Sequence, residues 1–191
     1  MVPRMMIEHK LPIVLSAEEI NKLLDATNDL KYKTMFATMY SSGMRVSEVI
    51  HLHYDDISRT NMQIHVRDTK NRMDRYTILS ERNLALLTKY WFQKGQPREI
   101  LFPNKFTGQH LTVSTLEQVM RRSVVAAGLT GKITPHCLRH SFATHLMEQR
   151  NIQTLLGHRD PKSTEVYLHV SNKSLMGIKS PFDKKEGDAN E

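Results

Sequence analysis

The stretch LKYKTMFATMYSSGM at positions 30–44, rich in apolar side chains, constrains the fold more than any other part of this sequence. Its composition predicts a buried helix, and Gly43 is placed to end that helix in the left-handed backbone conformation that glycine adopts without strain. A buried helix needs a core around it. At 191 residues the chain falls in the size range of one ordinary domain, which is long enough to bury such a core.

Local start and stop signals predict further helices around the buried one. Ser16 and Glu19 have the spacing of a capping box, and an apolar stripe follows them at Ile20, Leu23 and Leu24. The same kinds of signal predict helices over residues 46–52, from Ser80 to Phe92, from a capping box at Ser114 and Glu117 to Gly128, from Thr134 and Pro135 onward, and within 152–158 and 163–170. Residues 100–112 are expected to form a connecting loop, and 184–191 a disordered tail.

Apolar and polar residues alternate on both sides of a polar centre in MQIHVRDTKNRMDRYTIL, residues 62–79, which predicts a β-hairpin with a long turn. The chain is therefore expected to have an α+β fold that is mainly α-helical with a small antiparallel β-sheet or hairpin. We expect one domain over residues 1–191, with a core over about 11–174 and a C-terminal segment over 175–191.

Charge and cysteine content narrow the class of protein. The formal net charge is +7, an excess of cations that suits a polyanionic partner such as nucleic acid. Cys137 is the only cysteine, so one chain can build neither a disulfide framework nor a cysteine-based zinc cage. No run approaches the roughly 18 apolar residues of a membrane span. These features favour a soluble cytoplasmic protein without a membrane partner.

The run HCLRH places His136, Arg139 and His140 at positions i, i+3 and i+4, on one side of a helix. Two histidines at this spacing can bind zinc, but HExxH sites carry a glutamate after the first histidine, and Cys137 occupies that position here. The run could instead bind a phosphate. Taken alone, it could also be structural, with His140 and His145 packing or capping and Arg139 solvated.

Four stretches resemble, in order, the catalytic domain of the tyrosine recombinases, the family of phage integrases and Xer-type recombinases. They are SSGMRVSEVIHLHYDDI, DTKNRMDRYTIL, TPHCLRHSFATHL and LLGHRDPKSTEVYLHVS, and the resemblance covers roughly residues 11–175. It implies a catalytic set of Arg45, Lys70, His136, Arg139, His158 and Tyr167, with Glu48 as a supporting acid. Lys70 follows from aligning Arg75 with the arginine that opens the second strand of the family hairpin; Arg72 and Arg75 are its competitors.

These residue types suit transfer of a phosphodiester. Forked guanidinium groups bind the non-bridging oxygens, His136 is the expected base for the nucleophile Tyr167, His158 is expected to donate to a phosphate oxygen, and Lys70 to protonate the leaving 5′ oxygen. The resemblance implies a 3′-phosphotyrosyl intermediate on double-stranded DNA, with no metal or other cofactor and no small-molecule substrate. It also implies self-assembly on DNA, from dimer to tetramer.

Two departures from the family pattern keep an alternative open. Only about ten residues precede the first predicted helix, so the family's N-terminal DNA-clamping domain is expected to be absent, and the chain is about four residues short between Gln149 and Ile152. The alternative is a catalytically inactive or truncated DNA-binding relic or regulator of the same fold. A metal hydrolase that uses the histidines is a third hypothesis.

The C-terminal segment SNKSLMGIKSPF carries four large apolar side chains and too little chain to build its own core. They are Leu175, Met176, Ile178 and Phe182. In the family such a segment docks on a neighbouring protomer. The competing expectation is that it folds back on its own domain.

Overall fold

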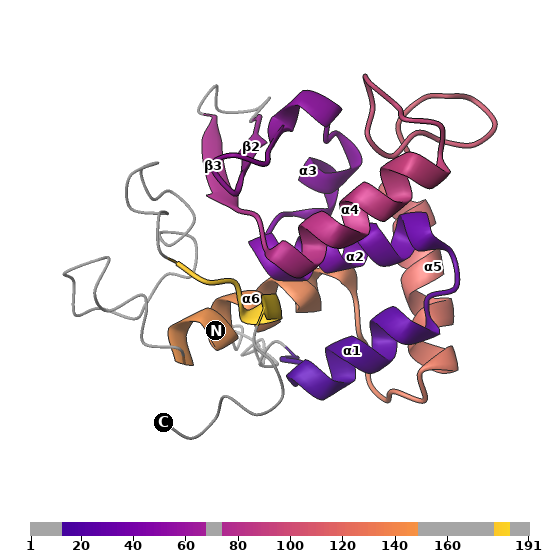
Figure 1. Cartoon of the computed structure of the whole chain (residues 1–191). Helices are drawn as coiled ribbons and strands as arrows, with labels where there is room; N and C mark the ends of the chain where they lie inside the picture. Colours follow the sequence, from indigo (N-terminus) through magenta and orange to yellow (C-terminus); the bar gives the residue numbers. More distant parts are fainter. Residues whose placement is uncertain (1–12, 68–73, 149–177, 184–191) are drawn as a thin grey trace, which may run out of the picture.

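The computed structural model describes residues 13–67, 74–148 and 178–183. Within these ranges the elements follow one another as α1 (Ala17–Ala26), α2 (Leu30–Ser42), α3 (Val46–Ile50), η1 (Tyr54–Asp56), β1 (Ile57–Ser58), β2 (Gln63–Val66), β3 (Arg75–Ile78), α4 (Glu81–Gln93), α5 (Val113–Ala126), α6 (Pro135–Glu148) and η3 (Pro181–Asp183). The predicted class, mainly helical with a small antiparallel sheet, is confirmed. Figure 1 shows β2 and β3 at the edge of the helical body, beside α3.

The apolar stretch forms the central helix α2, which packs against α1, α3, α4 and α6. Every residue from Thr34 to Ser42 is buried, as the composition predicts. Gly43 follows in the left-handed conformation, with φ 64°, and ends the helix. The chain therefore turns sharply between α2 and α3, and the residues of the candidate site lie around this turn.

The capping signals predicted the correct N-cap residue for α1 but the wrong one for α5. In α1 the Ser16 hydroxyl accepts from Glu19 N at 3.1 Å while Ser16 N donates to Glu19 Oε2 at 2.8 Å, which is the predicted capping box. Helix α5 begins two residues earlier than predicted, because the hydroxyl of Thr112, not of Ser114, accepts from Thr115 N. Gly128, with φ 65°, follows the end of α5 as expected.

The predicted hairpin strands are β2 and β3, which pair antiparallel from Gln63↔Ile78 to Val66↔Arg75. The two-residue strand β1 pairs with β2 on the other side and completes a three-stranded sheet, β1-β2-β3, in the described part of the chain. At the end of the hairpin away from its turn, Leu79 N donates to Met62 O at 2.9 Å. One face of the hairpin lies on α2, where the Thr77 hydroxyl donates to Ser42 O at 2.6 Å.

Residues 178–183 pack on their own domain. The Ser180 hydroxyl donates to Ser41 O at 2.7 Å, and the buried Phe182 ring meets the Tyr40 ring edge-on. The Asp183 carboxylate then accepts from the first backbone N–H groups of α4, at 3.0 and 3.1 Å. Ile178 and Phe182 therefore follow the second of the two expectations for the C-terminal segment, that it folds back on its own domain.

Several predictions concern residues outside the described ranges. They include the hairpin turn, the helices expected within 152–158 and 163–170, the shortened segment between Gln149 and Ile152, the side chains of Leu175 and Met176, and the tail 184–191. No helix in the described ranges is long and apolar enough to cross a membrane.

Candidate active site

Arg45 is the N-cap residue of α3, directly after the Gly43 turn and the buried Met44. Its backbone N–H donates to Glu48 Oε2 at 2.7 Å, and its Nη1 donates to Glu48 Oε1 at 3.2 Å. Glu48 stands three residues after Arg45, so its carboxylate reaches back to the start of the helix, as in a capping box. The side chain of Arg45 nonetheless keeps 41% of its surface exposed and can meet a ligand.

Glu48 is more than one half of a surface ion pair. Its Oε2 also accepts from Arg75 Nη2 at 2.7 Å, and the Arg75 side chain, at the start of β3, is only 6% exposed. Glu48 itself is 13% exposed. The carboxylate therefore stands between a buried arginine from the hairpin and the half-exposed Arg45, and it contacts both the backbone N–H and the guanidinium group of Arg45. The ion pair of Arg45 and Glu48 is therefore not an isolated surface pair.

Arg139 reaches the same turn from α6. Its Nη1 donates to Gly43 O at 2.7 Å, a contact between residues 96 apart in the sequence. Helix α6 packs directly on α2, and this packing brings Arg139 to the end of α2. The structure thus brings Arg45 and Arg139 to one turn, as the resemblance implies for its two arginines.

The histidines of α6 differ in environment. His136 is exposed and lies one helical turn before Arg139, on the same side of α6. His140 is half-buried, and burial lowers its pKa, with further lowering by the neighbouring His136 and Arg139. His145 points elsewhere: its Nδ1 lies 2.9 Å from the Tyr40 hydroxyl. Of the three, His136 is the exposed one, one turn before Arg139, while His145 packs, as the structural alternative expected.

The other three expected site residues, Lys70, His158 and Tyr167, lie outside the described ranges. Within those ranges, no group of three or more His, Cys, Asp or Glu side chains is arranged to hold a metal ion. Arg45 and Arg139 thus bring two guanidinium groups to one turn, and His136 lies one helical turn before Arg139.

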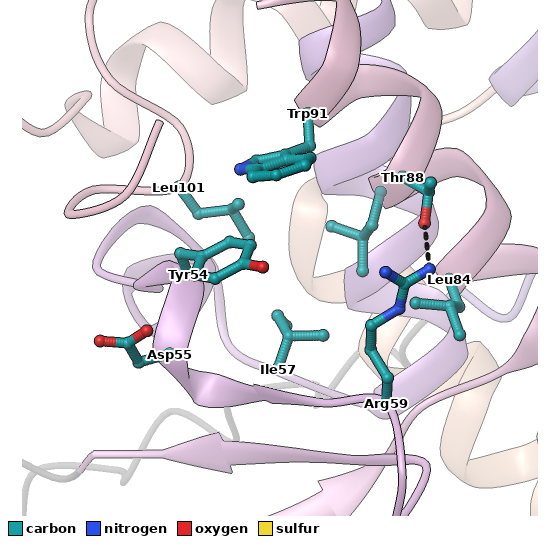
Figure 2. A pocket seen from close by; sticks show the side chains of 9 residues that line it. Tyr54, Asp55, Ile57, Arg59, Leu84, Thr88, Trp91 and Leu101 are labelled. Carbon is teal, nitrogen blue, oxygen red and sulfur yellow. Dashed lines mark hydrogen bonds between the residues drawn. The ribbon is translucent and has the colours of Figure 1, made fainter. Parts of the chain in front are cut away.

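A cavity of about 230 Å³ lies elsewhere, between η1, β1 and α4 (Figure 2). Its walls are mostly apolar, and the Tyr54 and Trp91 rings stack at one side with centroids 5.2 Å apart. Arg59 closes another side and donates to the Thr88 hydroxyl at 3.4 Å. None of the described site residues lines this cavity, so it is separate from the candidate active site.

Two partners in the site were not predicted as such from the sequence. Arg75 was used to align the hairpin and was a competitor of Lys70, and its contact with Glu48, which spans 27 positions, was not predicted. The Gly43 carbonyl, which accepts from Arg139, is a backbone group, so no residue type in the sequence indicates this contact. The alternation of residues 62–79 predicted the strand that carries Arg75, but it did not indicate the contact with Glu48.

This site and fold define a member of a known class. Residues 14–174 match the model of the phage integrase family, and the chain belongs to that family. The predicted resemblance is therefore confirmed.

Particular relatives agree with this assignment. The chain is 37% identical over 178 residues to a putative integrase/recombinase, y4qK, from Sinorhizobium fredii (strain NBRC 101917 / NGR234), covering 91% of this chain and 58% of the relative. Among solved structures, the XerA recombinase superposes with a TM-score of 0.70 at 29% identity, covering 92% of this chain and 65% of that one. The XerH site-specific recombinase bound to its difH substrate, a pre-cleavage complex, superposes with a TM-score of 0.67 at 27% identity. The match covers 84% of this chain and 51% of that one.

Proposed function

We propose that this chain is the catalytic domain of a site-specific recombinase that cleaves and rejoins double-stranded DNA through a 3′-phosphotyrosyl intermediate. The observation that carries the proposal is the convergence of Arg45 and Arg139 on the Gly43 turn, with Glu48 and Arg75 supporting Arg45. Membership of the phage integrase family supports it, as does the similarity to XerH in complex with its DNA substrate.

The two arginines suit the binding of a phosphodiester in its transition state. In-line attack by an oxygen spreads negative charge over the non-bridging oxygens, and a planar guanidinium can donate to two of them at once. The Arg45 side chain is 41% exposed, and Glu48 contacts both its backbone N–H and its guanidinium group, so the guanidinium group is oriented and open to solvent.

Tyr167 is the proposed nucleophile, and the burial of other tyrosines supports this choice. The sequence has six tyrosines. Burial raises the pKa of Tyr40 to about 12 and also raises that of Tyr90, so neither gives up its proton readily. Tyr54 stacks on Trp91 beside the separate cavity. In the proposal His136 accepts the phenolic proton of Tyr167, and His158 donates to a phosphate oxygen.

Lys70 is proposed as the general acid. As the P–O5′ bond breaks, the leaving oxygen takes a proton from the Lys70 ammonium group, while the phenolic oxygen of Tyr167 forms the new bond to phosphorus. The exchange of one phosphodiester for another conserves the bond energy, so the step needs neither ATP nor a metal. The 5′-hydroxyl of another strand can then reverse it.

Assembly of two to four copies on DNA belongs to the same proposal. Since Ile178 and Phe182 pack on their own domain, these copies would have to meet through other surfaces or exchange this segment. The chain spans 58% of the length of y4qK, and the activity of a full-length protein is part of the proposal as well.

The decisive experiment is covalent capture on a nicked suicide DNA, in which the fragment released by cleavage diffuses away and rejoining is blocked. The unaltered protein should form an adduct, and Tyr167→Phe should form none while keeping its fold and its DNA binding, because only one oxygen is removed. Adduct formation should not change with a chelator, whereas the metal-hydrolase hypothesis requires it to stop. DNA binding without any adduct from the unaltered protein would favour the inactive DNA-binding module instead.

A further inference from the structure

The outer face of the hairpin carries a network that the catalytic proposal does not use. The inner face is tied to the domain by Arg75 and Thr77. On the outer face, His65 in β2 stacks on Tyr76, its cross-strand neighbour in β3, with ring centroids 5.0 Å apart. The His65 ring also lies between two carboxylates: Nε2 is 3.0 Å from Asp74 Oδ2, and Nδ1 is 3.4 Å from Asp56 Oδ1.

Asp56 is a fixed point in this network. Its side chain is 2% exposed, and its oxygens accept from His53 N at 2.9 Å and from Arg67 Nε at 2.7 Å. The carboxylate is therefore held by η1 and by the residue that follows β2. Asp74, by contrast, directly precedes β3 and is half-exposed. His65 thus connects a fixed carboxylate in η1 with the start of the second hairpin strand.

The His65 ring presents one nitrogen to each of the two carboxylates. A neutral imidazole has one N–H and can donate to only one carboxylate, whereas an imidazolium donates through both nitrogens. The charged groups that face the ring are Asp56 from η1, Asp74 before β3, and Arg67 after β2, which partly neutralises Asp56. The phenol of Tyr76 covers the ring from β3.

We propose that His65 is a positioning residue, which sets the two strand ends on either side of residues 68–73 by linking Asp74 to Asp56. The functional consequence rests on the proposed function, because Lys70 lies between these two ends in the sequence. His65 touches no reacting atom in this proposal. It determines where the general acid is presented.

The first test measures the link without any DNA. Amide hydrogen exchange of residues in β2 and β3 is followed by NMR in the unaltered protein, in His65→Phe, which keeps a ring over Tyr76 but removes both nitrogens, and in Asp74→Asn. We expect about two- to five-fold lower protection near the turn in both variants, the effect of a partly exposed ion pair. Asp55→Asn is the matched control, because Asp55 is exposed and neighbours Asp56. It should leave protection unchanged. Equal protection in all four proteins would overturn the proposal whatever the chain does to DNA.

The last test separates positioning of the acid from general damage. On ordinary nicked DNA, His65→Phe should form the adduct at least about two- to five-fold more slowly than the unaltered protein. On DNA with a bridging sulfur in place of the 5′ oxygen, the P–S bond breaks and the thiolate leaves without a proton, since a thiol ionises near pH 8.5. There the two proteins should react alike. A slowing of equal size on both substrates would contradict positioning, whereas no adduct from the unaltered protein on either substrate would contradict the proposed function alone.

Discussion

Replacing Glu48 with glutamine should destabilise the protein by more than a loss of helix capping can explain. Glutamine keeps the size of the side chain and one oxygen, and it is itself a capping-box residue, so the contact with Arg45 N can survive. What disappears is the negative charge that faces Arg75, which is 6% exposed and 2.7 Å away.

The size of the effect follows from that burial. Removing one partner of a buried ion pair costs about 3–5 kcal/mol. Glutamine still offers an oxygen to Arg75, and Glu48 keeps 13% exposure, so the expected loss is smaller, about 2–3 kcal/mol, the value of a hydrogen bond to a charged group. With a urea m-value near about 2.5 kcal/mol/M, the unfolding midpoint should fall by about 1 M.

Glu19→Gln provides the matched control for this measurement. Glu19 is the same capping-box residue in α1, where it accepts from Ser16 N at 2.8 Å, and its surroundings are exposed. Its replacement should change the free energy of unfolding by less than about 0.5 kcal/mol. If urea unfolding gives Glu48→Gln and Glu19→Gln the same stability, the Glu48–Arg75 pair contributes nothing and the argument is refuted. A double-mutant cycle with Arg75→Gln would then show no coupling.

Other expectations concern pH, the C-terminal segment and salt. Burial lowers the pKa of His145 more than Glu148 raises it, so the folded state favours the neutral ring. The stability should therefore fall as the pH drops below the unfolded pKa of about 6.5. Over the same pH range the urea midpoint of His145→Gln should fall less than that of the unaltered protein. Phe182→Ala should lower the free energy of unfolding by about 3 kcal/mol. Phe106 is 90% exposed, so Phe106→Ala should change it by less than about 0.5 kcal/mol. Equal effects of the two substitutions in urea unfolding would mean that residues 178–183 do not dock on the domain. DNA affinity measured by fluorescence anisotropy should drop steeply between about 50 and 200 mM salt, and a flat response would contradict binding through phosphates.

The elements that could be predicted from the sequence are those whose signals are local. The Ser16 box joins residues three positions apart, and Gly43 needs only its own backbone freedom to end α2. The start of α5 was misjudged because Thr112 and Ser114 both carry a capping hydroxyl, and the sequence alone did not show which would be used. Strand β1 has two residues, too few to show alternation.

The supporting parts of the candidate site depend on contacts between distant residues. Arg75 reaches Glu48 across 27 positions, and Arg139 reaches Gly43 across 96. No local pattern records such pairs. The family motifs supplied Arg45, His136 and Arg139 as residues, while the meeting of the two arginines at one turn required the packing of α6 on α2.

The anchoring of Phe182 and Asp183 also limits how far the proposed nucleophile can travel. Tyr167 precedes Ile178 by eleven positions, and Ile178 packs against the core of its own domain. An extended chain covers at most about 3.6 Å per residue, so the Tyr167 backbone can reach no more than about 40 Å from that anchor. While the anchor holds, a phosphate that Tyr167 attacks must lie within this tether length, whether its own protomer or a neighbouring one binds that phosphate. Any longer reach requires Phe182 to leave its place beside Tyr40 first.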